Sequence, residues 1–373
     1  MAILGGDIRD ANNPLTIDTL EDLKTILTDT SYIPSAGSGS YYIAFPEVYN
    51  GPKVIDLRSK GWNPITITTT EFAPLSTTMS INIYFNGWTI LGLSMMDSTF
   101  LYIRATYGSG QDSSVSIINI YDMIIKNAYV FCLTNDCCLI RYNKTNSNGS
   151  GSLRLYRCKI SAMLDAQYYY NAYCVYNNSR YAYLYINQCS FNLQAANSGD
   201  SSRKVRCIYS YEDSYTIMTN CIVAISSKRW ICNEKTSFVV AGTQMRFCKV
   251  IGDIIGSSTS IYYMSIIQAT GQCAYNAVDI SYTTNQSYDS SGKVGISFGS
   301  GVNMVNRSKL KHKTGELIAI VDGNYRTLCT TEQMIDKDWL NDHYFICGET
   351  PSDAPPHKRR LIFITHLHER RCA

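Results

Sequence analysis

An imperfect repeat between about residues 98 and 282 constrains the fold of this chain more than any other feature of its sequence. Each copy reads apolar-x-apolar-x-x-(Cys or Met)-x-apolar, as in Leu184-Tyr-Ile-Asn-Gln-Cys189-Ser-Phe. The anchor residue of the repeat recurs at intervals of 27 to 35 residues, at Met123, Cys158, Cys189, Cys221 and Cys248. Self-similarity at such a period is typical of a stacked array of supersecondary units. The sequence therefore predicts a solenoid.

The repeat has the composition of short β-strands. A second alternating piece lies between the anchors, as in Tyr173-Cys-Val-Tyr176, and both pieces are rich in β-branched and aromatic residues. No window sustains the apolar stripe of a helix. Strands of one coil would pair in parallel with those of the next, which predicts an all-β, right-handed parallel β-helix. A β-propeller is the main rival, but it needs about four strands per 40–50 residues and a Trp-Asp or kelch signature that the chain lacks.

The cysteine usage fits this prediction. The chain has 14 cysteines, but no CxxC motif, so a structural zinc site has no support. Single cysteines inside apolar segments are interpreted as reduced, buried, small hydrophobic residues of a protein made in a cytosol. Stacking of the coils predicts a ladder of reduced cysteines, formed by Cys158, Cys189, Cys221 and Cys248.

Changes in the pattern divide the chain into four segments. They are an N-terminal cap with the first coils (1–97), the β-helix repeats (98–301), a C-terminal hairpin-helix module (302–350), and a Pro-rich connector with a basic tail (351–373). The cap includes a short amphipathic helix, for which Asp18 is the expected N-cap and Glu21 completes a capping box. The third segment starts with a hairpin around the Asp322-Gly-Asn324 turn, and a helix follows through about Leu340.

Charge and hydropathy exclude several classes of partner. A formal charge of +3 over 373 residues does not favour nucleic acid as a partner. The N-terminus lacks the basic start and apolar stretch of a signal peptide, and no run approaches the roughly 18 apolar residues of a membrane span. We therefore expect a protein without a membrane partner that is not exported by the general secretory route.

Few residues have the pattern of a catalytic or metal site. All five histidines lie in the last 62 residues, so Ser-His or Cys-His catalysis on the solenoid is set aside. Glycan cleavage needs two carboxylates about 5–9.5 Å apart, for which Glu212 and Asp213 are candidates, with a solvated turn as the alternative. His366 and His368 share one face of an extended strand, so three copies on a threefold axis could ligate one metal ion. No other cofactor is predicted.

Clustered tyrosines are a further candidate site. Tyr168, Tyr169 and Tyr170, with nearby Tyr173, are candidates for binding a glycan or a partner protein, because their rings stack and their hydroxyls form hydrogen bonds. The alternative is that they cover the outside of the solenoid or its subunit contacts, since tyrosine is a favoured strand residue.

The chain resembles bacteriophage virion proteins in three stretches. These are the repeats of the Ile-Asn-Gln-Cys189-Ser-Phe type, the opening helix followed by Tyr41-Tyr-Ile-Ala-Phe-Pro46-Glu, and Thr331-Glu-Gln-Met-Ile-Asp-Lys-Asp-Trp-Leu340 near the C-terminus. The resemblance implies a parallel β-helix appendage of the tailspike, tail-fibre or head-fibre kind. Such proteins are typically homotrimers in the virion, made in the cytoplasm of the bacterial host, and they contact other virion proteins.

Some proteins of this kind bind glycans on the host surface, and some degrade them. This chain is short for the degrading kind and has no evident acid pair. The resemblance therefore favours a structural or adhesive appendage that contributes to virion assembly and host-surface binding. The alternative is a polysaccharide-degrading tailspike enzyme, a lyase or glycoside hydrolase, that uses a carboxylate pair on one face of the β-helix.

Overall fold

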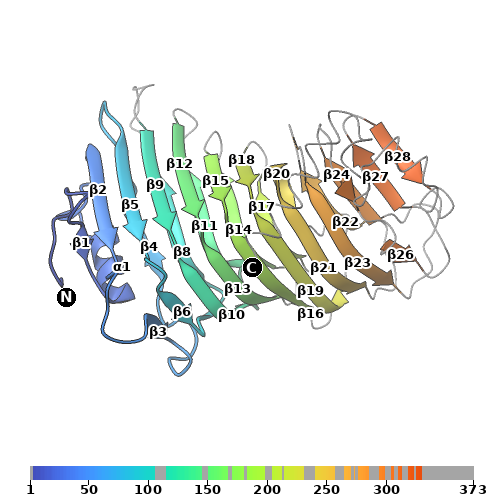
Figure 1. Cartoon of the computed structure of the whole chain (residues 1–373), viewed down its shortest axis with the longest axis horizontal. Coiled ribbons are helices and arrows are strands. Elements are labelled where there is room, and N and C mark those ends of the chain that lie inside the picture. The colour runs from blue at the N-terminus through green and yellow to red at the C-terminus, as the bar shows by residue number, and fades with distance from the viewer. Residues whose placement is uncertain are drawn as a thin grey trace, which may run out of the picture.

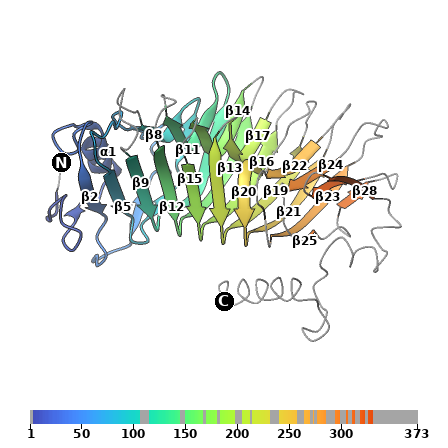
Figure 2. The ribbon, with the colours of Figure 1, turned by 90° about the horizontal axis from the view of Figure 1, so that it is seen from above.

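Strands stacked side by side along one long axis make up most of this molecule, as Figures 1 and 2 show. The structure is a computed structural model, and its strands form an all-β solenoid of parallel sheets. It describes residues 3–105, 115–144, 150–166, 170–179, 183–197, 204–211, 214–230, 240–256, 264–269, 273, 276–284, 294–298, 304–305, 310–312, 318–322 and 325–329.

The strands fall into three rows, which are the three faces of the solenoid. The first row contains β1 (Leu15–Thr16), β2 (Gly39–Ala44), β5 (Met79–Tyr84), β9 (Val115–Tyr121), β12 (Ser150–Tyr156), β15 (Tyr183–Asn187) and β18 (Tyr215–Thr219). The second row, a separate sheet, contains β3 (Val54–Asp56), β6 (Thr89–Leu91), β7 (Ser94–Met96), β10 (Ile124–Cys132), β13 (Lys159–Ala166), β16 (Ser190–Asn197), β19 (Ile222–Trp230), β21 (Lys249–Gly256), β23 (Ala277–Thr284), β25 (Met304–Val305) and β26 (Leu310–His312).

The third row shares a sheet with the first, and β20 (Val240–Arg246) pairs with strands of both rows. Its other members are β4 (Ile67–Thr68), β8 (Thr99–Ala105), β11 (Cys137–Lys144), β14 (Asn171–Ser179), β17 (Lys204–Ser210), β22 (Met264–Ala269), β24 (Val294–Phe298) and β27 (Ile318–Asp322). One coil of the chain therefore runs through the second, third and first rows in turn, as β10, β11 and β12 do.

Equivalent residues of successive coils lie side by side in parallel register. Ile118 of β9 pairs with Leu153 of β12, which pairs with Leu184 of β15. All three side chains are buried and belong to one continuous hydrophobic cluster. The repeat thus places its apolar residues in columns along the interior, which is the packing that the alternating pattern predicts.

A sharp corner joins the first row to the second. The residue at this corner has a left-handed backbone in five successive coils, with φ between 54° and 58°, at Asp122, Arg157, Gln188, Asn220 and Phe247. Its N–H donates to the next coil, as in the bond from Gln188 N to the Thr219 carbonyl oxygen (3.0 Å). The next residue along the chain is the repeat's anchor. The corner therefore fixes where each anchor side chain enters the interior.

The helix near the N-terminus is α1 (Leu20–Thr28). Its N-cap is Thr19 and not Asp18 as expected, because the Thr19 hydroxyl accepts from the Asp22 backbone N–H (3.1 Å) and donates to the Asp22 carboxylate (2.8 Å). The reciprocal cap therefore lies one residue later than predicted, with Asp22 in place of Glu21. The apolar face of α1 is buried.

The last described strands pair differently from the rest. Strand β28 (Tyr325–Cys329) pairs antiparallel with β27, as the turn at Asp322-Gly-Asn324 predicts, and β27 pairs in parallel with β24. The helix expected through about Leu340 and the segment 351–373 lie outside the described residues.

Candidate functional site

The anchor cysteines form a column inside the solenoid. Cys158, Cys189, Cys221 and Cys248 are free thiols, each at most 2% exposed, and each directly follows a left-handed corner residue. The Cys158 backbone N–H donates to Cys189 Sγ (3.4 Å), and Cys189 Sγ lies 3.5 Å from the Leu155 carbonyl oxygen of the preceding coil. These thiols therefore connect the backbones of neighbouring coils at the corner.

Burial makes Cys189 and Cys248 poor nucleophiles. Desolvation raises the pKa of Cys189 and of Cys248 well above the ordinary value, because the interior disfavours the thiolate. The same cause raises the pKa of Cys138 to about 12. Since the thiolate is the reactive form and all four side chains of the column are buried, we assign the column a structural role.

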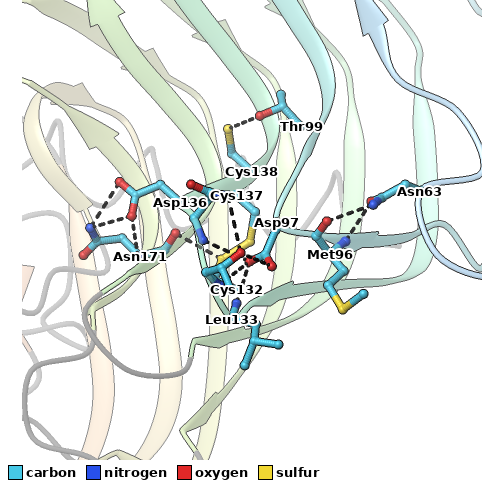
Figure 3. Close-up of a disulfide and its surroundings, with 12 residues drawn as sticks. Asn63, Met96, Asp97, Thr99, Cys132, Leu133, Asp136, Cys137, Cys138 and Asn171 are labelled. Carbon is cyan, nitrogen blue, oxygen red and sulfur yellow. Dashed lines mark hydrogen bonds between the residues drawn. A yellow bond between two sulfur atoms is a disulfide. The ribbon is translucent and has the colours of Figure 1, made fainter.

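The interpretation of every cysteine as reduced is wrong for one pair. Cys132 at the end of β10 and Cys137 at the start of β11 form a disulfide, shown in Figure 3. The chain turns from the second row to the third between them, which brings their Cα atoms to 5.7 Å, within the range that a disulfide spans. The Asp97 carboxylate holds this turn, because it accepts from the N–H groups of Leu133 (2.6 Å) and Thr134 (2.8 Å).

The tyrosines of the first row stack on one another. The rings of Tyr84, Tyr121 and Tyr156 lie in three successive coils with centroids 4.8 and 5.0 Å apart and interplanar angles of 9° and 10°. Both faces of the Tyr121 ring are therefore covered by its neighbours. Such a ladder stabilises the stacking of coils. It leaves little ring face for a ligand.

The predicted tyrosine cluster is described only in part. Tyr173 is 3% exposed, and its ring stacks on those of Tyr176 (4.5 Å) and Tyr209 (5.7 Å). Tyr170 is exposed at the start of β14, whereas Tyr168 and Tyr169 lie outside the described residues. In the described part, Tyr173 thus belongs to a packed outer cluster of the third row.

A groove of about 480 Å³ lies on the outer face of the second row, where the sequence had indicated no site. Tyr129, Met163, Gln194 and Ser226 stand in register on β10, β13, β16 and β19, and Ser161 and Asn192 form a shorter parallel row. Because strands are ~4.8 Å apart, the longer row spans ~14 Å. The groove thus offers amide and hydroxyl groups at regular intervals along the molecule's long axis.

A β-bulge forms one wall of this groove. Between the pairs Ile125–Ile160 and Ala128–Ala162, β10 has one residue more than β13, and Asn127 there has a left-handed backbone with φ of 53°. Bulges bend a strand and redirect its side chains, and they are frequent beside binding sites. Here the bulge places Asn127 in the groove's lining.

Aromatic side chains border the groove on the side of the earlier coils. Trp62 is 43% exposed, and its ring centroid lies 5.4 Å from that of Tyr129 and 6.0 Å from that of Phe131. The Tyr129 hydroxyl donates to Asp165 Oδ2 (3.1 Å), and desolvation together with the Asp165 charge raises the pKa of Tyr129 to about 12. Tyr129 therefore stays a neutral hydrogen-bonding group beside an exposed indole.

The other predicted site residues lie outside the described part of the chain: Glu212, Asp213, His366 and His368. Within that part, no three His, Cys, Asp or Glu side chains gather in a way that could hold a metal ion. The same residues include no helix of the length and hydropathy needed to cross a bilayer.

Comparisons with known proteins assign no family. No protein-family model matches the chain, and no match was found among the curated proteins or the solved structures. The function of this protein therefore has to be inferred from the site itself.

Proposed function

We propose that this protein is an adhesive component of a bacteriophage particle, which binds a host-surface glycan in the groove of the second row. The observation that carries the proposal is the row formed by Tyr129, Met163, Gln194 and Ser226, with Asn192 beside it and Trp62 at one end. Amides and hydroxyls donate and accept hydrogen bonds as sugar hydroxyls require, and an exposed indole provides a flat apolar face.

Binding is favoured over cleavage at this groove. None of its lining residues carries a carboxylate. The carboxylate of Asp165, two residues from Met163 on β13, is buried and accepts a hydrogen bond from the Tyr129 hydroxyl. Hydrolysis of a glycosidic bond ordinarily requires two carboxyl groups on either side of the bond. The groove has the hydrogen-bonding groups for recognition without that pair.

The rest of the proposal concerns assembly. We propose a right-handed solenoid, as parallel crossovers almost always are, with α1 as the lid on its first coil. The exposed strands at the ends of a solenoid need covering, and the C-terminal module and tail would supply this in a homotrimer docked to other virion proteins. Supporting features are the burial of the apolar face of α1 and the third row, whose last described parallel strand, β27, pairs antiparallel with β28.

A glycan-binding assay with matched variants tests the groove. Wild-type protein is titrated against a panel of purified bacterial surface polysaccharides, both neutral and acidic. Asn192→Ala/Gln194→Ala removes two exposed amides from the groove, and its control is Asn13→Ala/Asn50→Ala, which removes two exposed amides near the N-terminus. Loss of two hydrogen bonds should weaken binding about 10-fold or more.

Trp62→Ala should also weaken binding, whereas Tyr211→Ala, which removes another exposed aromatic side chain, should not. Failure of wild-type protein to bind any member of the panel, or equal binding by groove and control variants, would overturn the proposal. Release of reducing ends or unsaturated uronates during incubation would instead assign a polysaccharide-degrading activity.

Assembly is tested separately by sedimentation equilibrium of the full chain and of a chain that ends at residue 356. A trimer that is lost on truncation, with unchanged β-sheet circular dichroism, is the expected result. A monomeric full chain would contradict the trimer, and a trimeric truncated chain would show that residues 357–373 are dispensable.

A further inference from the structure

A second hollow of about 500 Å³ lies on the corner between the first and second rows. Its lining comprises Glu47, Lys53, Asn86, Gly87, Asp122, Ile124, Arg157 and Lys159. This corner pocket is close to the groove, because Lys159 and Ser161 are two residues apart on β13 and so share its outer face. That spacing along a strand corresponds to ~7 Å. One extended ligand can therefore reach both places.

The charges of the corner pocket are unevenly compensated. The Arg157 guanidinium donates to both Asp122 carboxylate oxygens (2.7 and 2.8 Å), so these two groups neutralise each other. The remaining ionised residues are Lys53, Lys159 and Glu47, and the ion pairs formed among the described residues involve none of them. The pocket therefore has an excess of positive charge.

The positions of the two lysines suit a bound anion. Lys53 Nζ donates to the Asn86 carbonyl oxygen (3.2 Å), which holds its ammonium at the corner and leaves two of its three donors for other acceptors. Lys159 is exposed at the start of β13. Lysine ammonium groups bind carboxylate and phosphate as compact charges. The groove itself is lined by neutral side chains, so the two places prefer different parts of a ligand.

We infer that the corner pocket binds the acidic group of an anionic polysaccharide through Lys53 and Lys159, while neutral sugars of the same chain occupy the groove. The inference depends on the proposed glycan-binding function and narrows it to acidic glycans. A uronate carboxylate and a phosphodiester present the same chemistry to two lysines, and the assay separates them.

The test compares Lys53→Gln/Lys159→Gln with Lys24→Gln/Lys60→Gln, which removes two exposed lysines elsewhere. Each protein is titrated with polygalacturonate, with its neutral counterpart, carboxyl-reduced polygalacturonate, and with a teichoic acid. The panel of surface polysaccharides described above is included. We expect wild-type protein to prefer acidic glycans, with an affinity that falls as salt rises. The corner variant should lose about 10-fold or more of that affinity and keep its affinity for neutral glycans, whereas the control should keep both.

The outcomes distinguish this inference from the proposed function. Equal affinity of wild-type protein and the corner variant for acidic glycans, or binding of neutral glycans only, would overturn the corner site and leave the groove intact. If the corner variant lost binding to neutral and acidic glycans alike, the assignment of the corner pocket to the acidic group would be overturned. Failure of wild-type protein to bind any glycan would overturn both proposals. A preference for polygalacturonate identifies a carboxylate ligand, and a preference for the teichoic acid identifies a phosphate.

Discussion

The side chain of Asn276 occupies, beside Cys248, the place that a thiol occupies in the preceding coils. Its Oδ1 accepts from the Cys248 backbone N–H at 2.9 Å, and its Nδ2 donates to the Met245 carbonyl oxygen at 2.9 Å. Cys189 contacts the corresponding two groups of its own neighbouring coil, the Cys158 N–H and the Leu155 carbonyl oxygen. An amide and a thiol thus perform the same task at the corner of the solenoid.

Replacement of Asn276 should be costly when the new side chain cannot form these bonds. Asn276→Ala leaves the buried Cys248 N–H without its acceptor and the Met245 carbonyl without its donor, so we expect a loss of about 1–3 kcal/mol in the free energy of unfolding. Asn276→Cys should lose less, because the Cys189 thiol makes both contacts. Urea denaturation of the wild-type protein and of both variants measures these free energies of unfolding. Equal stability of the two variants would contradict the shared role.

The column thiols should resist alkylation in the folded protein. Burial hides Cys158, Cys189, Cys221 and Cys248 from the reagent, and a raised pKa keeps Cys189 and Cys248 protonated. We expect iodoacetamide at pH 8 to label these four residues only after denaturation, as measured by peptide mass spectrometry. Raising the pH to 9 should speed the labelling of the denatured chain and leave the folded chain unaffected. Rapid labelling of all four in the folded protein would show that the column is accessible.

Reduction of the Cys132–Cys137 disulfide should lower stability modestly. The two cysteines are five residues apart, and the loop-entropy model gives about 2 kcal/mol for a loop this short. We expect dithiothreitol to lower the urea midpoint of the wild-type protein. Cys132→Ala/Cys137→Ala is the control, since its midpoint should not respond to the reductant. An unchanged wild-type midpoint, with reduction verified by mass spectrometry, would show that this cross-link adds nothing to stability.

The left-handed corner residues should differ in their tolerance of glycine. Gln188 has φ of 56° and an exposed side chain, and a left-handed backbone costs a residue with a Cβ about 1–2 kcal/mol. Gln188→Gly removes that cost but adds chain entropy to the unfolded state, so a net gain of up to about 1 kcal/mol is expected. Asn220→Gly should gain less, because asparagine adopts this conformation readily. Thermal unfolding of both variants tests this, and a larger gain for Asn220→Gly would contradict it.

The sequence predicts the solenoid because the apolar and polar residues of its repeat alternate with the period of a β-strand. Alternating apolar residues such as Leu153 and Leu155 point inward, and the anchors follow at near-regular spacing. Asn276 falls outside the repeat as the sequence defines it, because the repeat has Cys or Met at that position. Its spacing nevertheless matches the repeat, since Asn276 lies three positions after the buried Cys273 and two before the buried Val278.

The groove and the disulfide are harder to predict from the sequence. The groove depends on the left-handed backbone of Asn127 and on register between β10, β13, β16 and β19, and an asparagine between Lys126 and Ala128 does not reveal a bulge. The Cys132–Cys137 pair depends on the sharpness of the turn between β10 and β11. The groove arises only when coils are stacked, so a single copy of the repeat carries little sign of it.

The cysteine column has a consequence for how the length of the molecule is determined. The Cys158 N–H donates to Cys189 in the next coil, and the Cys248 N–H donates to Asn276 in the next coil, so these corners offer the following coil the same hydrogen-bonding group. In a solenoid each coil contacts only its neighbours, so an added coil offers the same hydrogen-bonding groups to the coil after it. Nothing in the repeat itself specifies a last coil. The number of coils is a property of the gene's length and of the segments that close the two ends, and duplication of one coil should yield a longer shaft with the same cross-section.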